Sequence, residues 1–88
     1  MKRYRILQRV SINNYDPTCW EEDNYSPIEA DNDTNAIEKY LDINDENIKA
    51  MNAKITEPKY GRAEIYYYND NNDEIKIDLL AEEIEEEK

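Results

Sequence analysis

The sequence predicts an α+β fold in which one helix packs on a small antiparallel sheet of four to five strands. Three observations lead to this prediction. Residues 2 to 12 alternate between two kinds of side chain with the period of a strand. Residues 31 to 42 begin with helix-capping residues and continue with apolar residues at helical spacing. Residues 62 to 80 contain two alternating segments joined by a polar loop, which is typical of a β-hairpin.

The composition limits how stable such a domain can be. The chain has 88 residues, 22 acids against 11 Lys and Arg, no His and a net charge of −11. Phe is absent, so eight Tyr and the single Trp must supply large apolar area. A domain this short buries only about 60–65% of its unfolded surface, and we expect a stability of a few kcal/mol.

The first predicted strand carries an apolar face and a basic face. Its apolar face consists of Tyr4, Ile6, Val10 and Ile12. The opposite face holds Arg3, Arg5 and Arg9. Residues 11 to 88 carry seven cations against 22 acids, so this basic strand lies in an acidic chain. We therefore expect its arginines to pair with carboxylates on neighbouring strands.

Residues 13 to 27 are predicted to form a long loop, because turn-forming residues begin it and Pro27 ends it. The loop contains an acidic triplet, Glu21-Glu22-Asp23, between Trp20 and Tyr25. Loops of this length are uncommon in small domains and are often functional.

A short strand over residues 26 to 30 and a helix follow this loop. Asn32 is the expected N-cap, and Asp33 in the first turn complements the helix dipole. The helix residues expected to face the sheet are Ala36, Ile37, Tyr40 and Leu41. The helix should end near Asp42, because turn-forming residues follow.

Two interpretations stay open for residues 45 to 52. Ile48 and Met51 allow one helical turn, whereas a strand through Ala53, Ile55 and Glu57 could begin early. Residues 58 to 61 are expected to form a turn, since they contain Pro58 and the only glycine of the chain.

The hairpin of residues 62–68 and 74–80 gives the clearest register. Its shared apolar face should consist of Ala63, Ile65 and Tyr67 on one strand and Ile75, Ile77 and Leu79 on the other. Tyr66 and Tyr68 should lie on the opposite face. Residues 1–80 are interpreted as one domain, and residues 81–88 as an acidic tail, either a short helix or a solvated extension.

The residue types exclude several classes of activity. Asp31-Asn32-Asp33-Thr34-Asn35 offers oxygen ligands, but Ala36 replaces the glycine that an EF-hand-like loop needs, so a helix cap explains the run better. Weak calcium binding in the 69–73 loop is left open. Without His to activate Cys19, and without a glycine-rich phosphate loop, we expect no enzyme, no metal and no cofactor. The net charge disfavours direct binding to nucleic acid or an anionic membrane, and we expect no membrane span and no signal peptide.

The surplus of acids points instead to a protein partner. In size, charge and tyrosine content the chain resembles small phage-encoded inhibitors that imitate nucleic acid, such as anti-CRISPR, anti-restriction and uracil-DNA glycosylase inhibitor proteins. Acidic runs carry this resemblance, among them residues 21–23, residues 31–33 and the Glu-rich tail. It implies an inhibitor in the bacterial cytoplasm that occupies the cationic nucleic-acid groove of a nuclease or repair enzyme.

The expected partner-binding residues are acids of the predicted loops and the aromatic residues near them. They are Trp20, Glu21, Glu22, Asp23, Tyr25, Asp31, Asp33, Tyr66, Tyr68, Asp70 and Asp73. The alternative function is a protein–protein interaction module of a phage or plasmid complex, in which acidity serves solubility only. A homodimer is left open.

Overall fold

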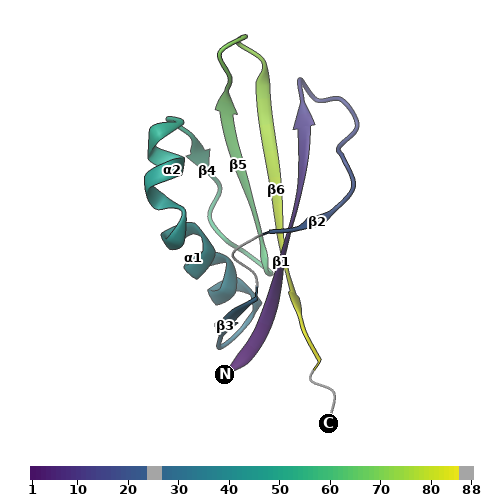
Figure 1. The fold of residues 1–88 in the computed structure, drawn as a ribbon, viewed down its shortest axis with the longest axis vertical. Coiled ribbons are helices and arrows are strands. Elements are labelled where there is room, and N and C mark those ends of the chain that lie inside the picture. The colour runs from purple at the N-terminus through teal and green to yellow at the C-terminus, as the bar shows by residue number, and fades with distance from the viewer. Residues whose placement is uncertain (24–26, 86–88) are drawn as a thin grey trace.

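The fold is α+β, as the sequence predicts, with more elements than expected (Figure 1). The computed structural model describes residues 1–23 and 27–85. Within these residues, a six-stranded antiparallel sheet packs against two helices. The prediction of four to five strands and one helix therefore undercounts both kinds of element. None of the helices in the described residues is long and apolar enough to cross a membrane.

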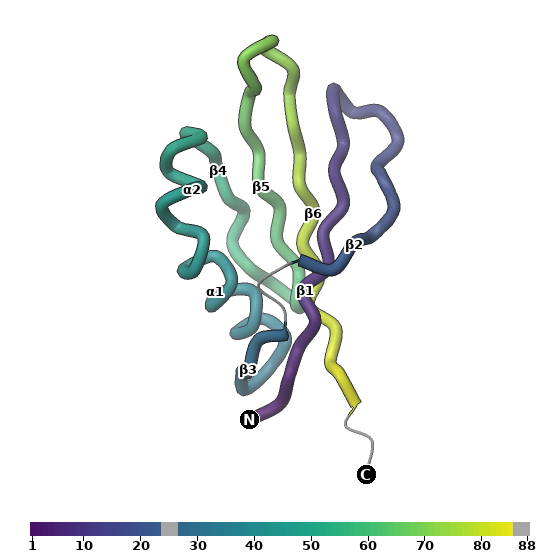
Figure 2. The backbone as a smooth tube through the Cα atoms, in the orientation of Figure 1, coloured from purple at the N-terminus to yellow at the C-terminus, as the bar shows by residue number. Residues whose placement is uncertain are grey.

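Strand β1 (Lys2–Ile12) is the central organising strand, and the alternation predicted for it is confirmed. One of its edges pairs with β6 (Glu74–Glu83) from Tyr4 to Ile12. Its other edge is divided between two short strands, β3 (Ile28–Ala30) and β2 (Glu21–Glu22). The remaining strands, β5 (Arg62–Tyr68) and β4 (Lys54–Ile55), complete the order β2-β1-β6-β5-β4 (Figure 2).

Strand β2 lies inside the segment predicted to be a loop, so that prediction is wrong for Glu21 and Glu22. Two glutamates carry neither apolar alternation nor β-branched side chains, which are the signals of a strand. They become a strand because the backbone lies along β1, where Leu7 pairs with Glu22 and Gln8 with Glu21. The contact supplies hydrogen bonds to an edge of β1 that would otherwise be open.

The hairpin prediction is confirmed in its register and in the bounds of β5, since Ala63 faces Leu79 and Ile65 faces Ile77. The prediction of a tail from residue 81 is wrong, because β6 continues through Glu83. These last residues pair with the start of β1, where Ile6 lies opposite Ala81. Eleven consecutive residues of β1 need partners, and this requirement extends β6 beyond its hairpin partner. Residues 86–88 lie outside the described residues.

The helical segment follows its predicted caps and then bends. Helix α1 (Asp33–Ile43) begins after Asn32, whose side chain accepts a hydrogen bond of 2.8 Å from the Asn35 N–H. The cap interpretation of residues 31–35 is therefore confirmed. Helix α2 (Asp45–Ala50) decides the open question for residues 45–52 in favour of a helix. It buries Ile48, and only a two-residue strand, β4, remains of the alternative.

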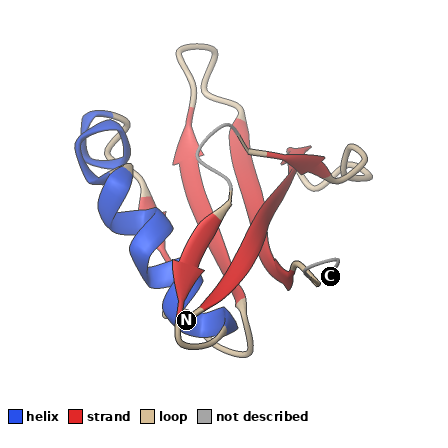
Figure 3. Cartoon of the chain, turned by 60° about the horizontal axis from the view of Figure 1, so that its bottom comes forward, coloured by secondary structure: helices blue, strands red, loops and turns tan. Residues whose placement is uncertain are grey.

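The helices cover one face of the sheet and leave the other face open (Figure 3). The core lies between that face and α1. It consists of Tyr4, Ile6, Ile28, Ala30, Ala36, Ile37, Tyr40, Ile48, Ala63, Ile65, Leu79 and Ala81. Side chains alternate along a strand, so the basic side chains of β1 project from the uncovered face. We call this uncovered side the open sheet face.

A tight turn between β4 and β5 joins the sheet to the start of α1. Lys59 and Arg62 exchange two backbone hydrogen bonds, and the two residues between them have positive φ angles, +53° at Tyr60 and +70° at Gly61. This is the conformation of a two-residue hairpin turn that favours glycine. A Cβ atom at position 61 would lie 2.7 Å from the Asp33 carboxylate carbon, so glycine is required for space as well.

We expect Gly61→Ala to lower the free energy of unfolding by about 2–3 kcal/mol, because a left-handed conformation and a steric clash add together. Asn72→Ala is the matched control. Asn72 also has a positive φ, of 63°, but is exposed at the end of the β5–β6 hairpin, and this variant should lose about 1 kcal/mol. Urea denaturation measures both. Equal losses would show that the contact with Asp33 does not constrain the turn.

Candidate functional site

The predicted partner-binding residues do not form one cluster. The molecule is elongated, with principal extents of 48 × 25 × 21 Å. Residues 20–23 lie beside the middle of β1, residues 31–33 lie at the start of α1, and residues 69–73 form the end of the β5–β6 hairpin (Figure 1). The acids are thus distributed along the long axis, at places that the topology holds apart.

Two acids of the triplet between Trp20 and Tyr25 stabilise the fold. Glu22 Oε1 lies 2.7 Å from Arg5 Nε, and the same arginine contacts Glu82 at 3.2 Å. Asp23 is half-buried and accepts a hydrogen bond of 2.9 Å from the Tyr40 hydroxyl. Reversing the whole triplet would therefore disturb the fold as well as the surface. Glu21 is exposed, and Tyr25 lies outside the described residues.

Trp20 packs on the protein's own arginines. Its ring centroid lies 4.5 Å from the Arg9 guanidinium and 5.9 Å from that of Arg62. The side chain is half-buried, so much of its surface is used to attach the loop to the open sheet face. Only the remaining exposed surface of Trp20 is available to contact a partner, which is the role predicted for it.

The other predicted acids also fall into two groups, those that form contacts within the protein and those that are exposed. Asp33 accepts a hydrogen bond of 2.7 Å from the Thr34 N–H and packs against the turn of residues 59–62. Asp73 accepts one of 2.9 Å from the Asn13 side chain and connects two loops. Asp31 and Asp70 are exposed, and both remain available to a partner.

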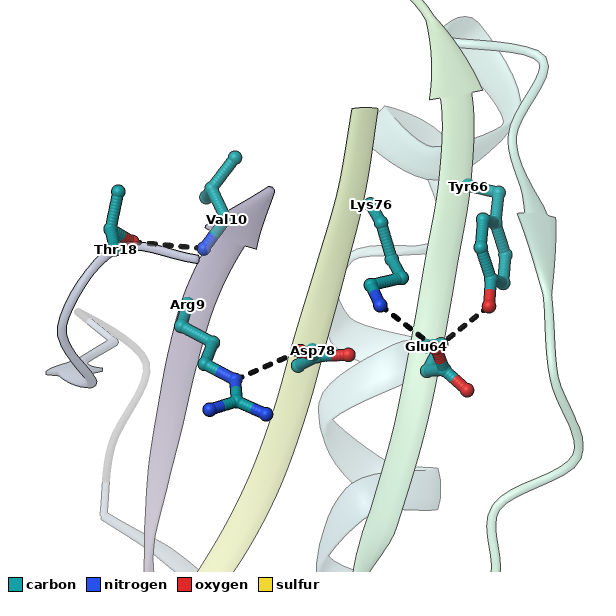
Figure 4. Close-up of polar contacts among 7 residues, drawn as sticks. All are labelled: Arg9, Val10, Thr18, Glu64, Tyr66, Lys76 and Asp78. Carbon is teal, nitrogen blue, oxygen red and sulfur yellow. Dashed lines mark hydrogen bonds and ion pairs between the residues drawn. The ribbon is translucent and has the colours of Figure 1, made fainter. Parts of the chain in front are cut away.

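Tyr66 and Tyr68 lie on the open sheet face, as predicted, but in different surroundings. The Tyr66 hydroxyl donates a hydrogen bond of 2.7 Å to Glu64 Oε2 (Figure 4). This bond, together with burial and the charge of Glu64, raises the pKa of Tyr66 to about 12. Tyr68 is 66% exposed and is free to contact another molecule.

Ion pairs across the strands balance the charges of the open sheet face, as the sequence predicts for the basic strand. Arg9 Nε lies 2.9 Å from Asp78 Oδ2, and Lys76 Nζ lies 3.9 Å from Glu64 Oε2 (Figure 4). The ion pairs of Arg5 lie on the same face. The basic residues of β1 are therefore largely used inside the molecule.

Sequence reasoning missed the acids of the helices. Residues 28 to 46 carry seven acids and one cation, Lys39. Six of these acids are exposed. Glu29 lies opposite Arg3 between the buried residues Ile28 and Ala30 of β3, so it belongs to the open sheet face. We call the other five the acidic helix face: Asp31, Glu38, Asp42, Asp45 and Glu46. Lys39 donates a hydrogen bond of 2.9 Å to the Glu29 carbonyl, and Lys49 of α2 pairs with Asp45 at 2.9 Å. A local charge count would have found this segment, whereas its exposure depends on the helix packing.

The described residues contain no group of three or more Cys, Asp or Glu side chains that could hold a metal ion. In comparisons with known proteins, no family model, curated protein or solved structure matches this chain.

The raised pKa of Tyr66 gives a pH-dependent prediction. A tyrosine with a raised folded pKa contributes stability that is complete below its ordinary value of 10.0 and is lost as the pH rises towards 12. We expect Glu64→Gln to lower the pKa of Tyr66, because the acceptor loses its negative charge. The ¹³Cζ shift of Tyr66 followed by NMR from pH 9 to 12 measures it.

Glu38→Gln is the matched control, since it removes one charge from the helix side of the sheet. It should leave the Tyr66 titration unchanged. Phenylalanine does not ionise, so in Tyr66→Phe the part of the stability loss between pH 10 and 12 that results from ionisation of Tyr66 should be absent. A Tyr66 titration that Glu64→Gln does not shift would contradict the assigned cause.

Proposed function

We propose that this chain is a non-enzymatic inhibitor that binds a positively charged nucleic-acid groove of a bacterial enzyme. The target class is a nuclease, such as a CRISPR or restriction nuclease, or a repair enzyme in the bacterial cytoplasm. The segregation of charge is the observation that carries the proposal. Arg5, Arg9 and Lys76 of the open sheet face pair with acids of the same face, while the acidic helix face carries a surplus of carboxylates.

This segregation matters because a partner responds to unbalanced charge. Glu38, Asp42 and Glu46 are exposed, and none forms an ion pair with a described cation. Such carboxylates attract a basic surface over roughly one Debye length, about 8–10 Å at physiological salt. The acidic helix face therefore provides both the steering and the contacts, and exposed Asp31 extends it to the start of α1.

The spacing of the carboxylates makes the mimicry approximate. Acids four residues apart on a helix are separated by about 6 Å along its axis. Each DNA strand presents about one charge per 3.4 Å. The acidic helix face therefore occupies fewer cations of the groove than DNA does, and its binding should weaken less steeply with salt than that of DNA.

A triple reversal on the acidic helix face, Glu38→Lys with Asp42→Lys and Glu46→Lys, should weaken binding to the partner by about tenfold or more. Each exposed ion pair contributes about 0.2–1 kcal/mol, and reversal replaces attraction by repulsion. The partner is first isolated from bacterial lysate at low salt and eluted with a salt gradient. Affinity and competition by the partner's own nucleic acid are then measured with purified components.

The control reverses three other exposed acids, Asp16, Glu57 and Asp70, and so changes the net charge by the same amount. It should retain most of the affinity, because only long-range steering is weakened. Equal losses in both variants would contradict the assignment of the surface. Absence of competition by nucleic acid, or salt-independent binding that requires Tyr68, would contradict the inhibitor function and favour an interaction module.

A further inference from the structure

The open sheet face contains a groove that the proposed function does not use. Its volume is about 460 Å³, within the range of small-molecule sites. Trp20 and Arg9 form one wall, and residues 56–59 before the tight turn form the other. Figure 4 shows part of the floor, where charged side chains of β5 and β6 lie side by side. The groove thus lies on the opposite side of the sheet from the acidic helix face.

Two cations that line the groove, Lys59 and Arg62, lie on paired backbone positions. They are directly opposite each other across the tight turn. Like charges directly opposite on paired strands destabilise each other. Neither forms an ion pair with an acid in residues 1–23 and 27–85, although Arg5, Arg9 and Lys76 do. In so acidic a chain, this pair is a local excess of positive charge.

The other charges of the groove restrict what can bind there. Arg9 is paired with Asp78, and Lys76 with Glu64, so these residues contribute little net charge. Glu57 also lines the groove and repels a ligand of high negative charge. A single phosphate or carboxylate group satisfies Lys59 and Arg62, whereas a polyphosphate would meet the acids of the floor. The guanidinium of Arg62 suits such a group, because it can donate two parallel hydrogen bonds.

We propose that this groove binds a small ligand through one oxyanion group, a phosphate or a carboxylate, held between Lys59 and Arg62. Trp20 lies beside the bound group, since its ring is already 5.9 Å from the Arg62 guanidinium. The site is independent of the acidic helix face, so a ligand and a protein partner can be bound at the same time.

The experiment follows the fluorescence of Trp20, the only tryptophan of the chain, during titration of the full-length protein. The probes are inorganic phosphate and acetate, with chloride at equal ionic strength as the reference. We expect a saturable change with a dissociation constant on the order of millimolar. The tighter of the two probes identifies the ligand as a phosphate or as a carboxylate compound.

Lys59→Gln and Arg62→Gln should each weaken this binding at least fivefold. Arg62→Gln also alters the surroundings of Trp20, so its fluorescence alone is not a sufficient measure of binding. In the Lys59→Gln variant, the NMR signal of the Arg62 Nε–H measures binding independently of Trp20 fluorescence. Lys49→Gln, on α2, is the control and should bind as the unaltered chain does. Responses to both probes that match chloride, or binding that survives both groove substitutions, would overturn the proposal.

Discussion

Pairing of β1 along both edges is the constraint on which the rest of the structure depends. This strand is the longest of the sheet, and most of its backbone groups lie within the sheet, so they need partners. The need extends β6 to Glu83 and brings β2 and β3 to the outer edge. Beyond these short strands, the loop before β2 also pairs with this edge of β1, since the Thr18 N–H donates a hydrogen bond to the Val10 carbonyl.

The same strand also divides the charges of the molecule. Its arginines project from the open sheet face, where acids of β2 and β6 pair with them. Partly buried and partly exposed ion pairs of this kind contribute modestly to stability. Their larger effect is on the surface, because they neutralise Arg5, Arg9 and Lys76 on the open sheet face. On the other side, Lys49 pairs with Asp45, whereas Glu38, Asp42 and Glu46 form no ion pair with a described cation.

The candidate surface illustrates why a residue's charge does not settle its role. Glu22, Asp23 and Asp33 have the same chemistry as Glu38 and Asp42, yet the first three hold strands, a tyrosine and a turn in place. The partners of Glu22 and Asp23 are each 17 residues distant in sequence, and Asp33 lies against the distant Gly61, so no local pattern reveals these contacts. The exposed acids of α1 follow from helix periodicity once the buried face is known, so this part of the surface was predictable.

The sequence by itself determined the elements whose signals are local. Alternation defined β1, β5 and the register of β5 with β6, and the capping residues defined the start of α1, because these patterns act over a few neighbouring residues. Only the tertiary structure decided that two glutamates form β2, that β6 continues past residue 80, and that Lys59 and Arg62 share a groove with Trp20. Each of these features depends on backbone or side-chain partners brought together by folding, and such partners have no signature in the local sequence.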